Sequence, residues 1–303
     1  MAFMLIPALA VFAFLTFWYL LFIGFLLVGL LRLRGAGTPA GERYTVLIAA
    51  RNEEQWIGRC LESVLKQTMA AERFDVVVVD DRSDDNTPRI LAEIAEREPR
   101  VTVVTVTELP EGISPKKHAL LRGLEAVRNP VVACTDADCI VPPTWLETID
   151  KHLDRDTGLV QGVTSYRRVK GMSTALSMFE SLDFLSHGIV SGASIGAGLP
   201  LNANGNNIAW RRLAFDDAGG YGESGTVLLG DDDLLMQRIH HDRRWQVRFM
   251  ADSRGAVTTE PETTLGAMLR QRARWGSVSV HYGVRRVALL AGVFLFFCGI
   301  PAA

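Results

Sequence analysis

Charged side chains are absent from the first 31 residues, and Phe3 to Leu31 form an almost unbroken apolar stretch. A helix of this length can cross the roughly 30 Å of hydrocarbon in a bilayer. A cleaved signal peptide would have a basic start and a shorter apolar core, and the chain has neither. The pattern predicts a transmembrane helix with its basic flank in residues 1–34.

A second uncharged run, residues 287–303, follows two adjacent arginines and ends the sequence. Its length is at the short end for a membrane span. We expect a C-terminal membrane segment, which could be a short helix, a segment lying on the bilayer, or part of a longer membrane region. Arg32 and Arg34 flank the first run in the same way, so the positive-inside rule predicts a cytosolic location for residues 32–286. The membrane would be the cell inner membrane or another plasma membrane.

Between these runs, the pattern changes to that of a folded domain. The Gly- and Pro-containing residues 35–43 predict a linker. After them, short β-branched runs alternate with stretches of helical spacing, as in a mostly parallel sheet flanked by helices. Strands are expected at 44–50, 74–79, 101–106 and 131–135, and helices at 53–67, 87–97 and 116–127. We therefore predict an α/β domain of nucleotide-binding type over residues 44–286.

Acidic residues directly follow two of the expected strands. Asp80 and Asp81 end the second strand, and Asp136 and Asp138 follow the fourth. Ligands of such sheets bind beyond the carboxyl ends of the strands, so these side chains are expected in a substrate site. Asp80 and Asp81 could accept hydrogen bonds from a uracil-like base or from ribose hydroxyls.

The spacing of Asp136 and Asp138 suggests a metal site. Two carboxylates in a turn could together approach a hard divalent cation, Mg²⁺ or Mn²⁺, and share it with substrate phosphates. Lys116 and Lys117 begin an expected helix, where one ammonium group could face a diphosphate, although most lysine pairs are only solvated.

The segment after the first strand is also polar. Ala50, Arg51 and Glu53 stand where a base and ribose could be held. Polar residues at a helix start are equally typical of ordinary caps, so the segment alone does not decide between the two interpretations.

Three adjacent acids, Asp231, Asp232 and Asp233, precede an apolar helix start. The helix dipole favours an acid at this position but needs only one. A carboxylate near a reacting hydroxyl can act as a general base, which favours a catalytic role for this run.

The last motif lies shortly before the C-terminal run. Arg274 offers a planar fork for phosphate oxygens, Trp275 a face on which a sugar or acceptor can stack, and Gln271 a hydrogen-bonding amide. The alternative is a basic helix that merely flanks a membrane.

Composition excludes several other classes. A net charge of −2 over 303 residues argues against a general nucleic-acid binder, which would carry a basic stripe. The four cysteines show neither paired zinc-site spacing nor a disulfide framework. With this net charge, any phosphate site must be formed by a small cluster of residues and not by an extended basic surface.

With these residues in place, the chain resembles the membrane-bound family 2 inverting glycosyltransferases, which include cellulose-synthase-like enzymes and ceramide glucosyltransferases. The resemblance implies a GT-A-type fold and covers about residues 44–282. It also implies an order of motifs: a nucleotide-contacting acid, a DxD metal motif, an acidic base motif and QxxRW. In this chain these are Asp80/Asp81, Asp136/Asp138, Asp231 and Gln271/Arg274/Trp275.

The family's lysine element matches residues 116–120, which favours Lys116 over Lys117 as the phosphate contact. The usual Glu-Asp pair of the base motif is replaced by Gly230-Asp231. Asp231 is the base implied by the resemblance, and Asp232 is the alternative.

The resemblance implies a nucleotide-diphosphate sugar as donor, with UDP as the expected nucleotide. Because one or two spans cannot build a polymer channel, we expect a lipid, lipid-linked or glycan acceptor. Residues 172–199 carry few charges and could lie on the bilayer beside the acceptor, or could pack on the core of the domain. The alternatives are a processive polysaccharide synthase, if the sequence is truncated, and a non-catalytic nucleotide-sugar-binding membrane module. An isoprenoid-diphosphate transferase is disfavoured because its acidic motif requires a helix, whereas a Val run precedes the acids here.

Overall fold

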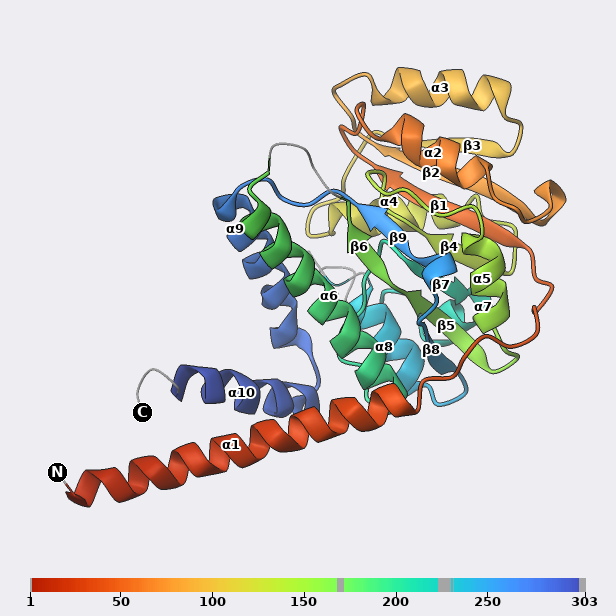
Figure 1. The fold of residues 1–303 in the computed structure, drawn as a ribbon. Coiled ribbons are helices and arrows are strands. Elements are labelled where there is room, and N and C mark those ends of the chain that lie inside the picture. Colours follow the sequence, from red (N-terminus) through yellow and green to blue (C-terminus); the bar gives the residue numbers. More distant parts are fainter. Residues whose placement is uncertain (1, 168–171, 223–229, 231, 300–303) are drawn as a thin grey trace.

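The computed structural model describes residues 2–167, 172–222, 230 and 232–299. A seven-stranded sheet forms its centre, with the order β3-β2-β1-β4-β7-β5-β8 (Figure 1). β7 pairs antiparallel with both β4 and β5, and the other neighbouring strands pair parallel. The strands are β1 Tyr44–Ala50, β2 Phe74–Asp81, β3 Val101–Val106, β4 Val131–Cys134, β5 Thr157–Gly162, β7 Ile208–Arg211 and β8 Gln246–Met250.

Helices cover both faces of this sheet. Alternate residues of β1 point to opposite faces, so Val46 and Ile48 pack with one set of helices while Leu47 packs with the other. The first set is α2 Ile57–Leu65, α3 Thr87–Arg97 and α5 Trp145–His152; the second is α4 Pro115–Leu124, α7 Arg212–Asp217 and α8 Asp233–His241. The predicted α/β class, with a mostly parallel sheet flanked by helices, is confirmed.

Two boundaries differ from the sequence-based expectation in ways that matter for the site. β2 continues through Asp80 and Asp81, which pair in register with Thr105 and Val106 of β3. Helix α2 begins at Ile57, because the residues before it form a loop that is hydrogen-bonded to the loop after β2. Asp80 and Asp81 are therefore the last two residues of β2, at the carboxyl end of the strand, and do not belong to the loop that follows it.

A two-stranded parallel sheet, β6 Thr164–Tyr166 with β9 Val257–Thr259, lies beside the main sheet. The chain then forms α9 Leu265–Gly276 and a short 3-10 helix, η4 Ser277–His281. In Figure 1, α9 lies alongside α6 Thr174–Gly196, at the side of the domain away from β3. This small sheet links the main sheet to α9.

Two apolar helices lie at the base of the domain. α1 Ala2–Leu31 contains the single candidate membrane span of the described residues, Leu9–Leu31. α10 Val284–Gly299 lies along α1 (Figure 1), with the rings of Tyr19 and Phe296 stacked at 4.5 Å. The expectation that the C-terminal run is a membrane segment stays a prediction.

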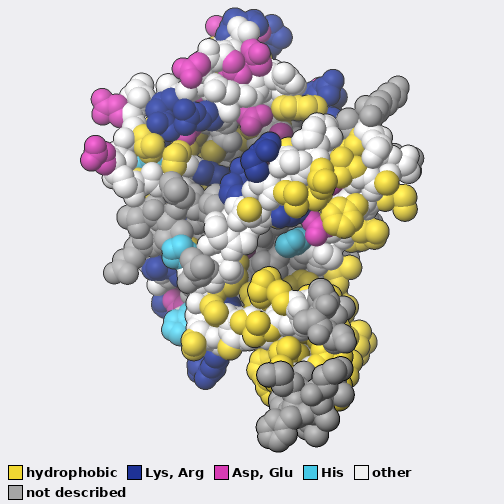
Figure 2. Space-filling view, turned by 90° about the vertical axis from the view of Figure 1, so that its left-hand side faces the viewer, with side chains coloured by type: hydrophobic (Ala, Val, Ile, Leu, Met, Phe, Trp, Pro, Cys, Tyr) yellow, Lys and Arg dark blue, Asp and Glu magenta, His cyan; other side chains and the backbone are white. Residues whose placement is uncertain are grey.

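α6 joins these apolar helices to the α/β domain. Its C-terminal half crosses α1 so closely that a Cβ on Gly29 would lie 1.8 Å from the carbonyl oxygen of Ala193. Its N-terminal half exposes a row of apolar side chains. Figure 2 shows hydrophobic side chains gathered on the face of the molecule that bears α6 and α9. The exposed apolar residues of α6 are Met178, Phe179, Leu182, Leu185 and Ile189.

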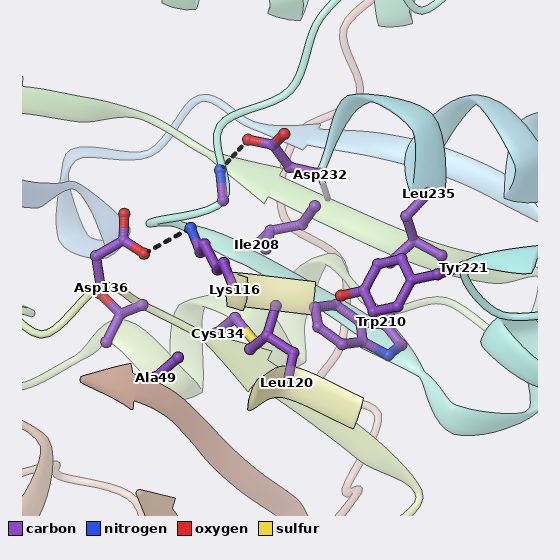
Figure 3. Close-up of a pocket in the computed structure, with 12 residues that line it drawn as sticks. Ala49, Lys116, Leu120, Cys134, Asp136, Ile208, Trp210, Tyr221, Asp232 and Leu235 are labelled. Atoms are coloured by element: carbon purple, nitrogen blue, oxygen red, sulfur yellow. Dashed lines mark hydrogen bonds and ion pairs between the residues drawn. The ribbon is translucent and has the colours of Figure 1, made fainter. Parts of the chain in front are cut away.

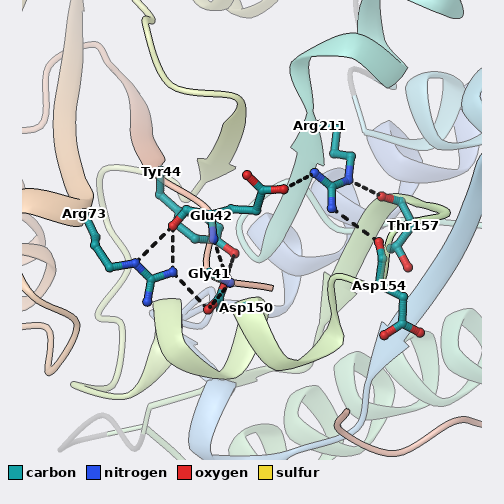
Figure 4. A network of polar contacts seen from close by, with 8 residues as sticks. All are labelled: Gly41, Glu42, Tyr44, Arg73, Asp150, Asp154, Thr157 and Arg211. Atoms are coloured by element: carbon teal, nitrogen blue, oxygen red, sulfur yellow. Dashed lines mark hydrogen bonds and ion pairs between the residues drawn. The ribbon is translucent and has the colours of Figure 1, made fainter. Parts of the chain in front are cut away.

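The expected linker is held firmly on the domain by Asp150 of α5 (Figure 4). The buried Asp150 carboxylate accepts hydrogen bonds from the backbone N–H groups of Gly41 and Glu42 at 3.2 and 3.3 Å. It also accepts from the Tyr44 hydroxyl at 2.8 Å and from the Arg73 guanidinium at 3.0 Å. Burial and the Asp150 charge raise the pKa of Tyr44, so the hydroxyl stays protonated and donates.

Replacing Asp150 with Ala is expected to destabilise the domain by about 3 kcal/mol, because Tyr44 and the linker amides would lose their acceptor while staying buried. Denaturant unfolding of the detergent-solubilised protein measures this loss. Asp216→Ala, which removes an exposed carboxylate paired with Arg212, is the matched control and should change stability by less than about 0.5 kcal/mol. Equal losses in the two variants would contradict the structural role of Asp150.

Candidate functional site

Loops from three parallel strands meet at the carboxyl edge of the sheet. The loop after β1 is fastened to the loop after β2 by backbone N–H groups: Asn52 donates to Ser83 Oγ at 3.0 Å, and Glu53 donates to Thr87 Oγ1 at 2.8 Å. Asn52 has a left-handed backbone with φ of 58°, a conformation uncommon for residues other than glycine. Ala50 is buried at the strand end, and Arg51 is exposed beside it. The two loops therefore form one rigid wall.

Asp80 and Asp81 are both buried but make different contacts. Asp81 is held by Arg82 in a two-pronged ion pair, with distances of 2.8 and 3.0 Å. Asp80 accepts one hydrogen bond among the described residues, from the Ser83 N–H at 3.3 Å. Asp80 thus keeps more acceptor capacity for a ligand than Asp81 does.

The DxD residues follow β4, which pairs directly with β1, so they lie beside that wall. Asp136 accepts a hydrogen bond from the Lys116 ammonium at 2.9 Å. Asp138 accepts from Thr259 Oγ1 at 3.2 Å and from Cys139 Sγ at 3.4 Å. Burial and then the Asp136 charge raise the pKa of Asp138. The structure brings Lys116 and the DxD segment together, as the sequence predicts.

Glu53 lies close enough to Asp136 and Asp138 to be affected by their negative charges. Burial, followed by the charges of Asp138 and Asp136, raises the pKa of the Glu53 carboxyl to about 7. Carboxylates that raise one another's pKa lack a compensating cation, and a divalent ion would supply it. The described residues include no set of three His, Cys, Asp or Glu side chains arranged to hold a metal alone. The oxygens present therefore fit Mg²⁺ or Mn²⁺ that shares its coordination with substrate phosphates.

Figure 3 shows how the start of α8 approaches the DxD segment. Asp136, Lys116 and Asp232 line one small pocket, and they come from three separate parts of the chain. The remaining lining residues are Ala49, Leu120, Cys134, Thr135, Gly205, Ile208, Trp210, Tyr221 and Leu235.

Both described acids of the 231–233 run hold a neighbouring loop. Asp232 accepts from the Gly205 N–H at 2.6 Å and from the Asp233 N–H at 2.8 Å. Asp233 accepts from the Ala203 N–H and from the Tyr282 hydroxyl. Asp231, the other predicted base, lies outside the described residues.

Gln271 connects α9 to the DxD segment through the small sheet. The Tyr166 hydroxyl lies 3.2 Å from Gln271 Oε1, and Tyr166 pairs in register with Thr259, whose hydroxyl contacts Asp138. Trp275 packs against Phe184 of α6 at a ring distance of 5.8 Å.

The two arginines of the QRARW stretch differ. Arg274 is exposed, and its guanidinium makes no hydrogen bond or ion pair with the described residues, whereas its backbone carbonyl accepts from the Ser277 hydroxyl at 2.7 Å. Arg272 is instead the packed one: it is paired with Asp183, and its guanidinium lies 4.4 Å from the centre of the Trp275 ring. Sequence reasoning did not single out Arg272, nor Thr259 and Tyr166, because each depends on contacts distant in sequence.

The raised pKa of Glu53 gives a pH-dependent stability. Its folded pKa of about 7 lies above the ordinary glutamate value of 4.5, so folding takes up protons between these values. The stabilising contribution is fully present below pH 4.5 and is lost as the pH rises through about 7. In the metal-free protein, the melting temperature of the wild type relative to Glu53→Gln should fall over this window. With saturating Mn²⁺ and UDP, this fall in melting temperature should occur at lower pH. A melting-temperature difference between wild type and Glu53→Gln that does not vary with pH would contradict the electrostatic coupling of Glu53 to the DxD carboxylates.

Comparison with known proteins identifies the family. Residues 39–277 match the model described as glycosyltransferase like family 2. Over 249 residues, covering 79% of this chain and 48% of the relative, it is 30% identical to the beta-monoglucosyldiacylglycerol synthase of Synechocystis sp.. It is 26% identical over 238 residues, 77% of this chain and 54% of the relative, to the poly-beta-1,6-N-acetyl-D-glucosamine synthase of Staphylococcus aureus. The chain thus spans about half the length of these curated relatives.

A solved structure supports the fold. The mannosyltransferase PcManGT from Pyrobaculum calidifontis, in complex with GDP-Man and Mn²⁺, superposes with a TM-score of 0.67 at 21% identity. The match covers 97% of this chain and 87% of that chain. The predicted GT-A-type fold is confirmed, and the chain belongs to the family 2 glycosyltransferases.

Proposed function

We propose that this protein transfers a sugar, with inversion, from a nucleotide-diphosphate sugar to a lipid, lipid-linked or glycan acceptor. UDP is the favoured nucleotide. The observation that carries the proposal is the meeting of Asp136, Lys116 and Asp232 at one pocket on the carboxyl edge of the sheet. We assign the catalytic domain to residues 44–286, between membrane segments in 1–34 and 287–303, with 35–43 as the connection.

The donor would bind across the wall and the DxD segment. Ala50, Arg51 and Glu53, with Asp80 and Asp81, would contact the base and ribose, and Asp80 has the greater remaining acceptor capacity. Asp138 and Asp136 would hold Mg²⁺ or Mn²⁺, which when bound neutralises charge on the diphosphate leaving group. Lys116, already 2.9 Å from Asp136, would contact the same diphosphate.

The acceptor would enter from the side of α9 and α6. A base from the Asp231–Asp232 pair would take the proton of the acceptor hydroxyl as it attacks the anomeric carbon. Attack from the face opposite the diphosphate inverts the configuration. Trp275 would form part of the acceptor floor, with Gln271 beside it and Arg274 meeting the phosphates.

A lipid acceptor is supported by the exposed apolar row on α6 and by the apolar helices α1 and α10 below it. The name of the Synechocystis relative also specifies a glycolipid product. We place the reaction at the cytosolic face of the cell inner membrane or another plasma membrane.

Product analysis tests this function. Purified protein is incubated with Mn²⁺, a panel of UDP- and GDP-sugars and a native lipid extract, and products are identified by mass. The expected product is a lipid carrying one added hexose-type unit. A long polymer would indicate a processive synthase, and nucleotide-sugar binding without turnover would indicate a non-catalytic module; either would contradict the proposal.

A further inference from the structure

A second cavity lies at the base of the catalytic domain, apart from the donor pocket. Its volume is about 950 Å³, which is within the size range of ligand sites. It is formed where the end of α1, the segment after α6, the end of α8, β8 and the start of α10 meet (Figure 1). It shares no lining residue with the pocket that contains Asp136 and Asp232.

The side chains that line this cavity are strongly basic. Arg32, Arg34, Arg243, Arg285 and Arg286 contribute guanidinium groups, and the described lining residues include no Asp or Glu. Two histidines and Arg248 also line it, although Arg248 is neutralised by an ion pair with Asp154. A cavity with this composition is a site for an anion.

Most of these guanidinium groups have no acidic partner among the residues that the structure describes. The Arg34 guanidinium donates to the neutral Gln246 side chain at 3.4 Å, and the Arg286 guanidinium donates to the Pro200 carbonyl at 2.8 Å. The guanidinium groups of Arg32, Arg243 and Arg285 make no hydrogen bond or ion pair within the described part of the chain. Their charge is therefore available to a ligand.

The pKa of His240 also reflects the uncompensated positive charge in this cavity. Its pKa is lowered first by burial and then by the charges of Arg286, His241 and Arg243. The pKa of Arg286 is itself lowered by burial. A bound anion would relieve this repulsion among like charges.

The location of the cavity indicates the source of the anion. Arg32 and Arg34 directly follow the candidate membrane span Leu9–Leu31, and α10 runs from the cavity along α1. If α1 spans the bilayer, the basic residues lie at the depth of the lipid headgroups, where phosphates concentrate. A soluble phosphate would share the charge but would have no reason to bind at this depth.

We infer that this cavity binds the phosphate group of an anionic phospholipid headgroup, and so fixes the catalytic domain against the membrane surface. This role is separate from glycosyl transfer and does not depend on which sugar or acceptor the enzyme uses.

Lipid retention in nanodiscs tests the inference. The full chain is reconstituted in mixed phosphatidylglycerol and phosphatidylcholine, released, and weighed by native mass spectrometry without donor. The wild type should retain phosphatidylglycerol in preference to phosphatidylcholine. Arg243→Gln combined with Arg285→Gln should weaken this retention by about tenfold or more, because each basic group near an anionic surface adds to the attraction. The remaining arginines beside the span are kept in place to preserve topology.

The matched control changes two exposed arginines away from the cavity, Arg97→Gln with Arg128→Gln, and should retain phosphatidylglycerol like the wild type. If both double variants lost phosphatidylglycerol to the same extent, the effect would come from net charge alone, and the proposed site would be wrong. Displacement of the lipid by inorganic phosphate or glycerol phosphate would assign the cavity to a soluble anion and overturn the lipid assignment. If the double variant does not fold, Arg243→Gln alone should still lower retention, and unchanged retention would refute the inference.

Discussion

Replacing Asp231 with Asn is expected to lower kcat by about 10²–10⁴-fold, while binding of the nucleotide-sugar donor changes by less than about twofold. The amide is nearly the same size as the carboxylate but cannot take the proton of the acceptor hydroxyl. Single-turnover rates measure the chemical step, and fluorescence titration with the UDP-sugar measures donor binding. Near-normal turnover in this variant would exclude Asp231 as the base.

Asp232→Asn is the matched comparison. Both Asp232 oxygens accept backbone N–H groups, from Gly205 and Asp233, so an amide at this position would present a donor to at least one of them. We therefore expect Asp232→Asn to lower the melting temperature more than Asp231→Asn does, and to lower kcat less. The opposite ranking of the two kcat values would assign the base to Asp232.

Local patterns were sufficient to predict the strands whose carboxyl ends carry Glu53, Asp80 and the DxD segment, where we propose that the donor binds. Val46 and Ile48 alternate with Leu47 in a run that could only be a doubly covered strand, and that run fixes where its carboxyl end lies. The strand order was not predicted, and it is the direct pairing of β4 with β1 in the structure that puts the DxD segment beside the loop after β1. Glu53, which the sequence analysis placed near the base and ribose, therefore also meets the charges of the DxD segment in the structure.

The arrangement of β6, β9, α6 and α9, where we propose that the acceptor binds, could not be predicted in the same way. β6 and β9 are three residues each, too short for a recognisable alternation, yet their pairing is what brings Thr259 to Asp138 and Tyr166 to Gln271. The sequence also does not distinguish Arg272 from Arg274. Only helix packing decides that Arg272 faces Asp183 on α6 while Arg274 faces outward. Sequence spacing within one helix gives relative directions, but not which neighbour each side chain meets.

Replacing Asp138 with Asn is expected to lower kcat by about 10³-fold at saturating donor, which corresponds to the several kcal/mol that a bound cation contributes to charge stabilisation. The structure also predicts a second effect, of opposite sign, on stability. Asp138 is largely buried and raises the pKa of Glu53, so removing its charge removes a repulsion. The metal-free variant should therefore melt at a higher temperature than the metal-free wild type at neutral pH.

These two readouts separate a metal ligand from a purely structural residue. In the wild type, Mn²⁺ with UDP should raise the melting temperature, and EDTA should abolish both this rise and turnover. In Asp138→Asn, Mn²⁺ with UDP should cause little rise. Asp84→Asn, an acid in the loop after β2, is the control and should keep the metal response. If Asp138→Asn lost activity but kept the full Mn²⁺-dependent rise, Asp138 would not hold the metal, and the charge relief at Glu53 would have to be explained without a cation between the two loops.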